Sequence, residues 1–305
     1  MPQGSTARAG WADAPRALVR ALERSLGAAV VAHEDLPGPA PGATASMVTA
    51  LLDLDDGRRV HADAVAASAD PRSVDRLERE AAVLRMLPAS VPHAHLLAGV
   101  RGGDWLALAR QALPQGDLGP PWRSQAIAAA RDVIEATASH VAPAGLPAAA
   151  DRLSDLDAWA SLASGPVQRL DDADRSMLPG LVTMSDGWRR WSAGDRLVHL
   201  DPRCENLVGR GDDVRLVGWA SASRGAGWTD SALLALDIVV SGHVGGPRTA
   251  ADLATGILAG LPYEATRFVV ARAGSLRLRA LTVADASEGR RADAARPLLE
   301  RIVPR

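Results

Sequence analysis

The chain has 305 residues, of which 47% are hydrophobic and 23% are charged, a balance typical of a folded globular protein. Its formal net charge of -2 gives no general attraction to polyanions, so we expect neither a nucleic-acid partner nor a membrane partner. No segment reaches the roughly 20 apolar residues that a membrane-spanning helix needs, and we expect a cytoplasmic protein. The chain contains no lysine, so all of its 34 basic residues are arginine.

The first 112 residues predict a small lobe rich in β-structure. Leucines at four-residue spacing indicate a first helix, and alternating apolar runs separated by turn residues indicate strands. The expected helices are 14–26 and 74–87, and the expected strands are 47–54, 59–65 and a pair within 96–109. A Pro-rich turn with Gly38 and Gly42 precedes the expected strand 47–54.

Residues 113–305 predict a larger and mostly helical lobe, after a segment rich in proline and glycine at 111–121 that is typical of a hinge. The expected helices are 125–140, 151–163, 230–241 and 250–261, with strand and loop structure over 197–219. A small β-rich lobe followed by a helical one predicts an α+β fold with two lobes.

The most informative segment is LVHLDPRCENLVGRGDDVRLVGW, residues 197–219. It resembles the catalytic loop of the aminoglycoside phosphotransferases, a kinase-like family whose pattern is His-x-Asp, four residues, then Asn. His199, Asp201 and Asn206 match this pattern, and the nearest likeness is to divergent bacterial members. The resemblance implies a protein-kinase-like fold, with a β-rich N-lobe at 1–112 and a helical C-lobe at 113–305.

The resemblance also implies roles for these residues. Phosphoryl transfer needs a carboxylate that orients the attacking hydroxyl and takes its proton, and this would be Asp201. Asn206 would be a magnesium ligand at the nucleotide, and His199 would brace the loop. Upstream, the family's helix glutamate corresponds to Glu80, and downstream Asp230 would hold the loop in place. Without the resemblance, Asp201 is equally understandable as a turn cap and Glu80 as a surface charge.

Two positions depart from the family pattern. The lysine that grips the nucleotide phosphates is replaced by Asp63, which would bring a second negative charge toward Glu80 and toward any triphosphate. Arg59 lies on the same strand face as Asp63 by period-two counting, so we expect it to compensate in part. The metal-binding aspartate is replaced by Gly218, and the nearest acids, Asp212 and Asp213, are poorly placed to substitute.

These departures leave three functions open. The first is a pseudokinase that binds an unknown small molecule or a protein or peptide partner. The second is an active small-molecule O-phosphotransferase with Asp201 as the base, and only this function requires ATP and magnesium. The third is ATP-independent chemistry on the same fold in a biosynthetic pathway.

Two further features affect the choice of ligand. From residue 265 onward the chain has nine arginines against four acids, which disfavours a polycationic aminoglycoside if this segment lines the acceptor site. A solvated helix face is the simpler explanation of that charge. The single cysteine, Cys204, would be reactive if Arg203 lowered its pKa, and is otherwise an inert loop residue.

Overall fold

The computed structural model describes residues 10–36, 47–114, 116, 118–153, 155–165, 170–211, 213–283 and 285–304, which form two compact units. The first unit comprises residues up to 89, 93–115 and 217–220, and the second comprises 90–92, 116–216 and 221 onward. A β-sheet characterises the first and helices dominate the second, so the expected two-lobed α+β fold is confirmed. The turn at Gly38 and Gly42 lies outside the described residues.

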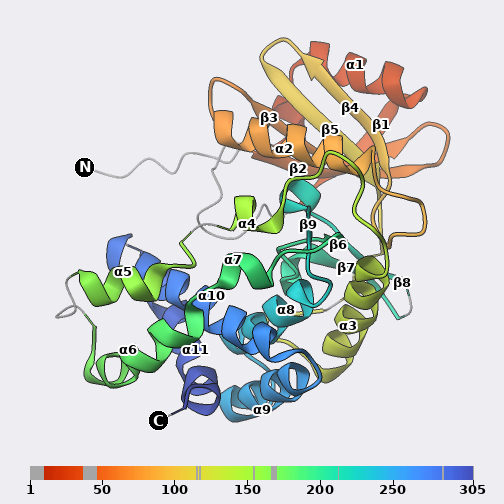
Figure 1. Cartoon of the computed structure of the whole chain (residues 1–305). Helices are drawn as coiled ribbons and strands as arrows, with labels where there is room; N and C mark the ends of the chain where they lie inside the picture. Colours follow the sequence, from red (N-terminus) through yellow and green to blue (C-terminus); the bar gives the residue numbers. More distant parts are fainter. Residues whose placement is uncertain are drawn as a thin grey trace. The chain divides into compact units, whose positions relative to one another are not determined.

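The first unit is a five-stranded antiparallel sheet with two helices (Figure 1). The strands are β1 (Val30–Asp35), β2 (Met47–Leu54), β3 (Arg59–Ala66), β4 (Leu96–Gly102) and β5 (Trp105–Gln111), and the helices are α1 (Arg16–Leu26) and α2 (Pro71–Leu84). The strand order is β1-β2-β3-β5-β4. The edge strand β1 was not expected, because its residues after Val30 are exposed and include charges, which hides the apolar signal of a strand.

The two faces of this sheet differ because strand side chains alternate. On one face, α1 buries Leu18 and Leu22 against small residues of the sheet such as Ala62 and Ala107. The approach is close at Gly102 in β4, where a Cβ atom would lie 2.4 Å from the Cα atom of Leu18. The opposite face carries the odd-numbered residues of β3 and the even-numbered residues of β5, and α2 contacts both of these strands.

The second unit has helices α3 (Ser124–Ala138), α4 (Ala149–Arg152), α5 (Ala158–Ser164), α6 (Asp172–Ser185), α7 (Trp188–Trp191), α8 (Thr229–Ser241), α9 (Gly246–Ala259), α10 (Tyr263–Thr282) and α11 (Ala286–Ile302). Its strands are β6 (Arg196–Val198), β7 (Leu207–Arg210), β8 (Asp213–Leu216) and β9 (Ser223–Gly225), paired as β6-β9 and β7-β8. The single helix expected over 151–163 is wrong, because α4 and α5 are separate.

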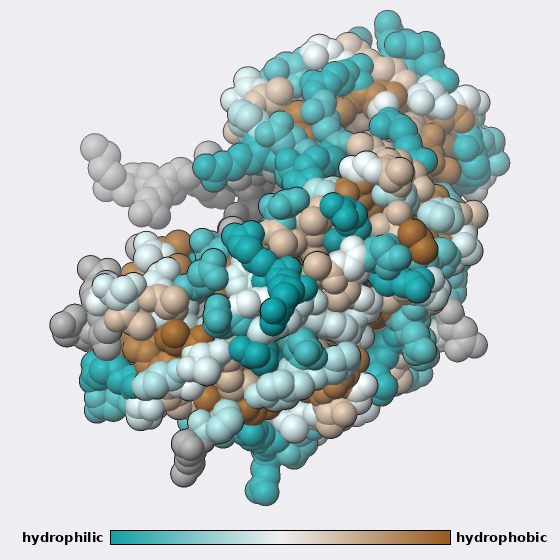
Figure 2. Space-filling model, in the orientation of Figure 1, coloured by the Kyte–Doolittle hydropathy of each residue, from teal (hydrophilic) through white to brown (hydrophobic). Residues whose placement is uncertain are grey.

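Helix α10 is central to the second unit, since it contacts α5, α6, α7, α8, α9 and α11. Helix α8 is buried along most of its length, from Thr229 to Val239, which agrees with its nearly continuous apolar sequence. None of the described helices combines the length and the apolar character needed to cross a membrane. On the face shown in Figure 2, apolar side chains form small separate patches among polar ones.

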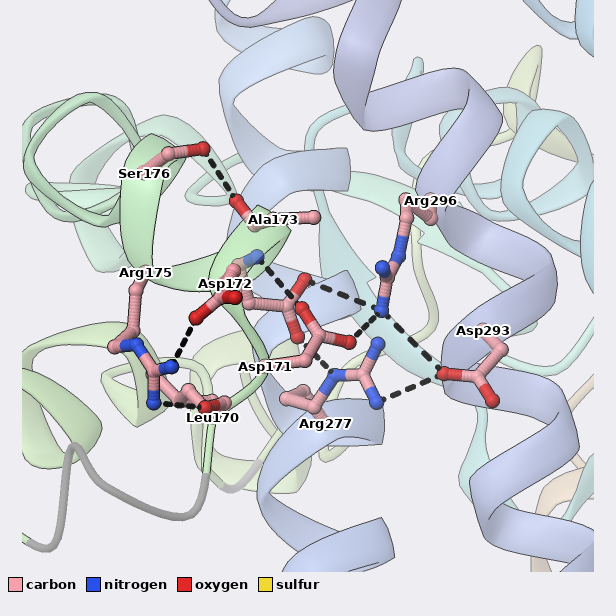
Figure 3. A network of polar contacts seen from close by, with 10 residues as sticks. Leu170, Asp171, Asp172, Ala173, Arg175, Ser176, Arg277, Asp293 and Arg296 are labelled. Carbon is pink, nitrogen blue, oxygen red and sulfur yellow. Dashed lines mark hydrogen bonds and ion pairs between the residues drawn. The ribbon is translucent and has the colours of Figure 1, made fainter.

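A network of arginines and carboxylates joins α6, α10 and α11 (Figure 3). The carboxylate of Asp171 caps α6 by accepting a hydrogen bond from the backbone N–H of Asp174 at 2.9 Å, and it also pairs with Arg296. Asp174 is buried and forms an ion pair with Arg277, whose Nε lies 2.7 Å from Oδ2. Arg277 and Arg296 therefore pair with carboxylates, and these ion pairs connect α6, α10 and α11.

Candidate functional site

The loop after β6 is held by a buried aspartate at the start of α8. The carboxylate of Asp230 accepts hydrogen bonds from the backbone N–H groups of His199, at 2.6 Å, and Leu200, at 2.8 Å. Leu200 has φ of +64°, a left-handed conformation that costs a non-glycine residue about 1 to 2 kcal/mol. The expected contact between Asp230 and this loop is confirmed, and these two bonds stabilise the unusual backbone.

His199 is fully buried and its ring braces the loop. Its Nδ1 accepts a hydrogen bond from the backbone N–H of Asp201 at 3.3 Å. The ring thus contacts the loop backbone, as expected for a positioning residue.

Asp201 and Asn206 are brought together as the spacing predicts. The Nδ2 group of Asn206 donates to the backbone oxygen of Asp201, at 2.8 Å, and to its carboxylate, at 2.9 Å. The carboxylate also forms a bidentate pair with Arg203, whose Nε and Nη2 lie 2.6 and 2.9 Å from its two oxygens. Burial raises the pKa of Asp201, but the hydrogen bonds and charge of Arg203, together with His199 and Asn206, outweigh burial and hold the pKa below its usual value. Asp201 is therefore an ionised carboxylate already bound to a cation.

The first unit contains a buried charge cluster around Asp63. Arg110, on β5, donates from Nη2 to Asp63 and from Nη1 to Glu80, which lies on α2, the latter at 2.5 Å. The side chains of all three are less than 10% exposed. Thr49 donates to the other oxygen of Asp63 at 2.7 Å. One guanidinium therefore joins two carboxylates that would otherwise repel each other.

The electrostatics of this cluster follow from its burial. Burial raises the pKa of Asp63, but the charge of Arg110, with smaller contributions from His61, Thr49 and Arg76, lowers it by more in total, so Asp63 stays ionised. His61 is on the same strand face, with Nδ1 at 3.2 Å from Arg110, and burial lowers its pKa. The cluster thus holds two negative charges against one positive charge, with a neutral imidazole beside them.

Arg59 does not compensate Asp63, and this expectation is wrong. Its Nη2 lies 2.7 Å from Glu34 and its Nε lies 3.0 Å from Asp53, and the Arg59 side chain is 46% exposed. Period-two counting placed it on the correct face, but the nearer acids on the neighbouring strands bind it first. Arg110 was missed because its position opposite His61 depends on the pairing of β3 with β5, which local sequence does not reveal.

Gly218 has φ of +78°, a conformation that favours glycine, and it precedes the fully buried Trp219. The ring of Trp219 packs edge-on against His93, with ring centroids 6.3 Å apart. Asp213 pairs with Arg215 at 2.8 Å, and Asp212 lies outside the described residues. Across the described ranges, no group of three or more His, Cys, Asp or Glu side chains is arranged to hold a metal ion.

Asp63 and Gly218 occupy the two positions that the resemblance assigned to the phosphate-binding lysine and the metal-binding aspartate. The charge of Arg110 is already matched by Asp63 and Glu80, and Gly218 supplies no carboxylate for a metal. Phosphate groups require uncompensated positive charge or backbone N–H donors, and magnesium prefers carboxylate oxygens.

A pocket of about 410 Å³ lies in the second unit, beside Asp201. Its charged lining is mostly basic, with five arginines against three acids. The arginines are Arg152, Arg203, Arg272, Arg279 and Arg291, and the acids are Asp201, Asp237 and Glu288. Leucine side chains such as Leu233, Leu236 and Leu276 supply an apolar wall. The pocket is within the usual size range of small-molecule sites, roughly 300 to 1,000 Å³.

Cys204 is buried in the loop after Asp201 and is not activated. Burial raises its pKa, and the charges of Glu205 and Asp237 raise it further. Arg203 pairs with Asp201 instead, and the Cys204 thiol donates to Glu205 at 3.5 Å. The alternative of a reactive cysteine is therefore wrong, and Cys204 is an inert loop residue in the folded protein.

Asp237 carries a testable pH dependence. Burial raises its pKa to about 6, although Trp122 and Ser241 donate hydrogen bonds to it at 2.9 and 3.0 Å. Because the folded-state pKa exceeds the unfolded value, Asp237 favours the native state at low pH and loses that contribution as pH rises through about 6.

Asp237→Asn should remove this dependence while keeping an acceptor oxygen. We expect the difference in free energy of unfolding, Asp237→Asn minus wild type, to become more positive by about 2 to 3 kcal/mol as the pH rises from roughly 4 to 8. Urea denaturation across this range checks it, with the exposed Asp252→Asn as control. A difference that does not change with pH would contradict the assignment.

Comparison with solved structures shows one recurring fold. A thermostable mutant of aminoglycoside phosphotransferase APH(4)-Ia, in its apo form, has a TM-score of 0.58 and 15% identity, over 92% of this chain and 98% of that chain. A choline/ethanolamine kinase family protein from Mesorhizobium loti has a TM-score of 0.58 and 16% identity, over 88% of each chain. Amicoumacin kinase hAmiN, in complex with AMP-PNP, Ca2+ and Ami, has a TM-score of 0.56 and 11% identity, over 86% of this chain and 88% of that one.

Comparison with family models and with curated proteins finds no match. The likeness to solved structures covers nearly the whole length on both sides, at identities that establish the fold alone. The chain therefore has the kinase-like fold of the aminoglycoside phosphotransferases and related small-molecule kinases.

Proposed function

We propose that this chain is a degenerate kinase-like protein, a pseudokinase, that binds a ligand without transferring phosphate from ATP. The observation that carries the proposal is the buried cluster of Asp63, Arg110 and Glu80. In an active kinase, a lysine pairs with the helix glutamate and keeps part of its charge for the nucleotide phosphates. Here a second carboxylate takes the lysine's place, and the cluster carries a formal charge of -1.

The acceptor side supports the same proposal. A general base must have a free oxygen directed at the hydroxyl whose proton it takes. The carboxylate of Asp201 is bound on both oxygens by Arg203, and Asn206 donates to the same group. This carboxylate is stabilised in its ionised form, which makes it a weak base.

Titration calorimetry with ATP, with and without magnesium, tests the proposal. We expect no saturable binding that depends on magnesium and no release of ADP. The matched comparison is Asp201→Ala, which should behave like wild type in both measurements. Magnesium-dependent ATP turnover by wild type that is lost in Asp201→Ala would overturn the proposal.

That same outcome would favour a second function, an active small-molecule O-phosphotransferase with Asp201 as the base. The observation in its favour is the loop itself, in which Asp230 holds the backbone and Asn206 meets Asp201 at the family spacing. This function requires the pair between Arg203 and Asp201 to open when the acceptor binds. It predicts that Asp201→Ala folds normally and is inactive with every acceptor.

A further inference from the structure

Two arginines in the pocket beside Asp201 have no carboxylate partner among the residues that the structure describes. Arg272, on α10, donates from Nη1 to the hydroxyl of Ser275 at 2.8 Å and forms no ion pair. Arg291, on α11, has a buried Nε without any hydrogen-bond acceptor. Both side chains line the pocket.

Leaving these cations unmatched is unfavourable in the free protein. Burial lowers the pKa of Arg272, because a charge removed from water is destabilised unless an opposite charge or several acceptors replace the water. A buried N–H donor without an acceptor, such as the Nε of Arg291, is destabilising because it has lost its hydrogen bond to water. Arg272, which donates only to a neutral hydroxyl, and Arg291, which has one N–H without an acceptor, therefore give the pocket positive charge that an anionic ligand could match.

The arginine-rich composition alone does not explain this arrangement, because several other arginines on the same two helices have carboxylate partners. Arg277 and Arg296 bind carboxylates in the network of Figure 3. Arg279, at the pocket margin, pairs with Glu288 at 2.6 Å. Arg272 and Arg291 also line the pocket, near Asp201 and Asp237 respectively, but neither forms an ion pair with a described carboxylate.

We infer that this pocket binds a small anionic molecule through a carboxylate or phosphate group held by Arg272 and Arg291. Guanidinium groups suit both anions because their N–H donors match two oxygens at once. The wall formed by Leu233, Leu236 and Leu276 favours a ligand with an apolar portion of a few carbons beside the anionic group. A polycation such as an aminoglycoside is disfavoured by the same charges. This inference names the ligand class of the proposed function. It rests on that proposal, because it takes this pocket to be the ligand site.

Calorimetry of the full chain tests the inference with butyl phosphate and butyrate as the two anionic probes. Three compounds serve as comparisons: inorganic phosphate lacks the apolar portion, 1-butanol lacks the charge, and spermidine carries positive charge. We expect saturable binding of at least one anionic probe and none of 1-butanol or spermidine. Tighter binding of butyl phosphate or of butyrate identifies the anionic group. Absence of binding for both anions, or binding of spermidine, would overturn the inference.

Substitution of the arginines provides the second measurement. Arg272→Met and Arg291→Met should each weaken binding of the anionic probe by about 10- to 100-fold, as expected for loss of charge-assisted hydrogen bonds. The matched control is Arg301→Met, since Arg301 lies on α11 and pairs with Asp252 instead. The melting temperature of Arg272→Met should be unchanged or higher, because a partly buried charge without an ion-pair partner is removed. Unaltered anion binding in both variants, or a markedly lower melting temperature without effect on binding, would assign these arginines a structural role.

The two proposals fail separately. Magnesium-dependent ATP turnover would overturn the pseudokinase while leaving an anionic ligand in the pocket. If ATP binds without turnover, the Arg272→Met variant separates pocket binding from a nucleotide site, because only pocket binding would be weakened. If the wild-type protein binds neither anionic probe, the pocket assignment is overturned and the pseudokinase proposal is unaffected.

Discussion

Replacing Arg110 with methionine should lower the free energy of unfolding by about 3 to 5 kcal/mol at neutral pH. The substitution leaves the carboxylates of Asp63 and Glu80 buried near each other without a cation. Removing one partner of a buried ion pair is costly because the remaining charges keep their desolvation penalty and lose their attraction. Urea denaturation followed by circular dichroism measures the loss.

The pH dependence and two variants make this result specific to the cluster. The Arg110 charge lowers the pKa of Asp63, so its stabilisation is present above the unfolded-state pKa and is lost as pH falls through the folded value. The deficit of Arg110→Met should therefore shrink in acid. Arg59→Met, which removes only exposed pairs, should cost less than about 1 kcal/mol.

A compensating variant removes all three charges of the cluster. Asp63→Asn combined with Glu80→Gln and Arg110→Met should recover most of the stability, because no buried ion remains. Equal losses for Arg110→Met and Arg59→Met would contradict the buried cluster.

Replacing Asp230 with alanine should lower the free energy of unfolding by about 2 to 4 kcal/mol. The variant leaves the backbone N–H groups of His199 and Leu200 buried without an acceptor. Those two bonds also stabilise the left-handed conformation of Leu200, so the loss should concentrate in this loop. Hydrogen exchange of the two amides should accelerate more than that of α10 amides.

Asp230→Asn is the matched control, since it keeps one acceptor oxygen of nearly the same shape. It should cost clearly less than Asp230→Ala. Equal exchange rates at His199 and Leu200 in wild type and Asp230→Ala would show that Asp230 does not hold the loop.

Local sequence predicted what local spacing determines. The strands β2 and β3 were placed within one residue because apolar alternation and the Asp55-Asp56-Gly57 turn define them. Asp201 and Asn206 contact each other because they lie only five positions apart in one loop. Asp230 was placed at the loop only through the family resemblance, because its contact spans about thirty residues.

Long-range partners could not be predicted in this way. Arg110 meets Asp63 only because β5 pairs with β3 across a break of some forty residues, and strand order is a global property of the fold. The pocket arginines of α10 and α11, Arg272, Arg279 and Arg291, were visible only as part of an excess of positive charge after residue 265. Which of them are matched depends on the packing of α10 against α11 and α6.

The burial of Cys204 makes the single thiol of the chain a natural reporter of loop opening. The side chain is 2% exposed and its pKa is raised, so a thiol reagent can label it only in molecules whose loop has transiently opened. The labelling rate divided by that of the unfolded chain gives the opening equilibrium of the Asp201 loop, separate from global unfolding. Ligands that close the loop should slow labelling in proportion to their occupancy, without any dye or tag added to the protein.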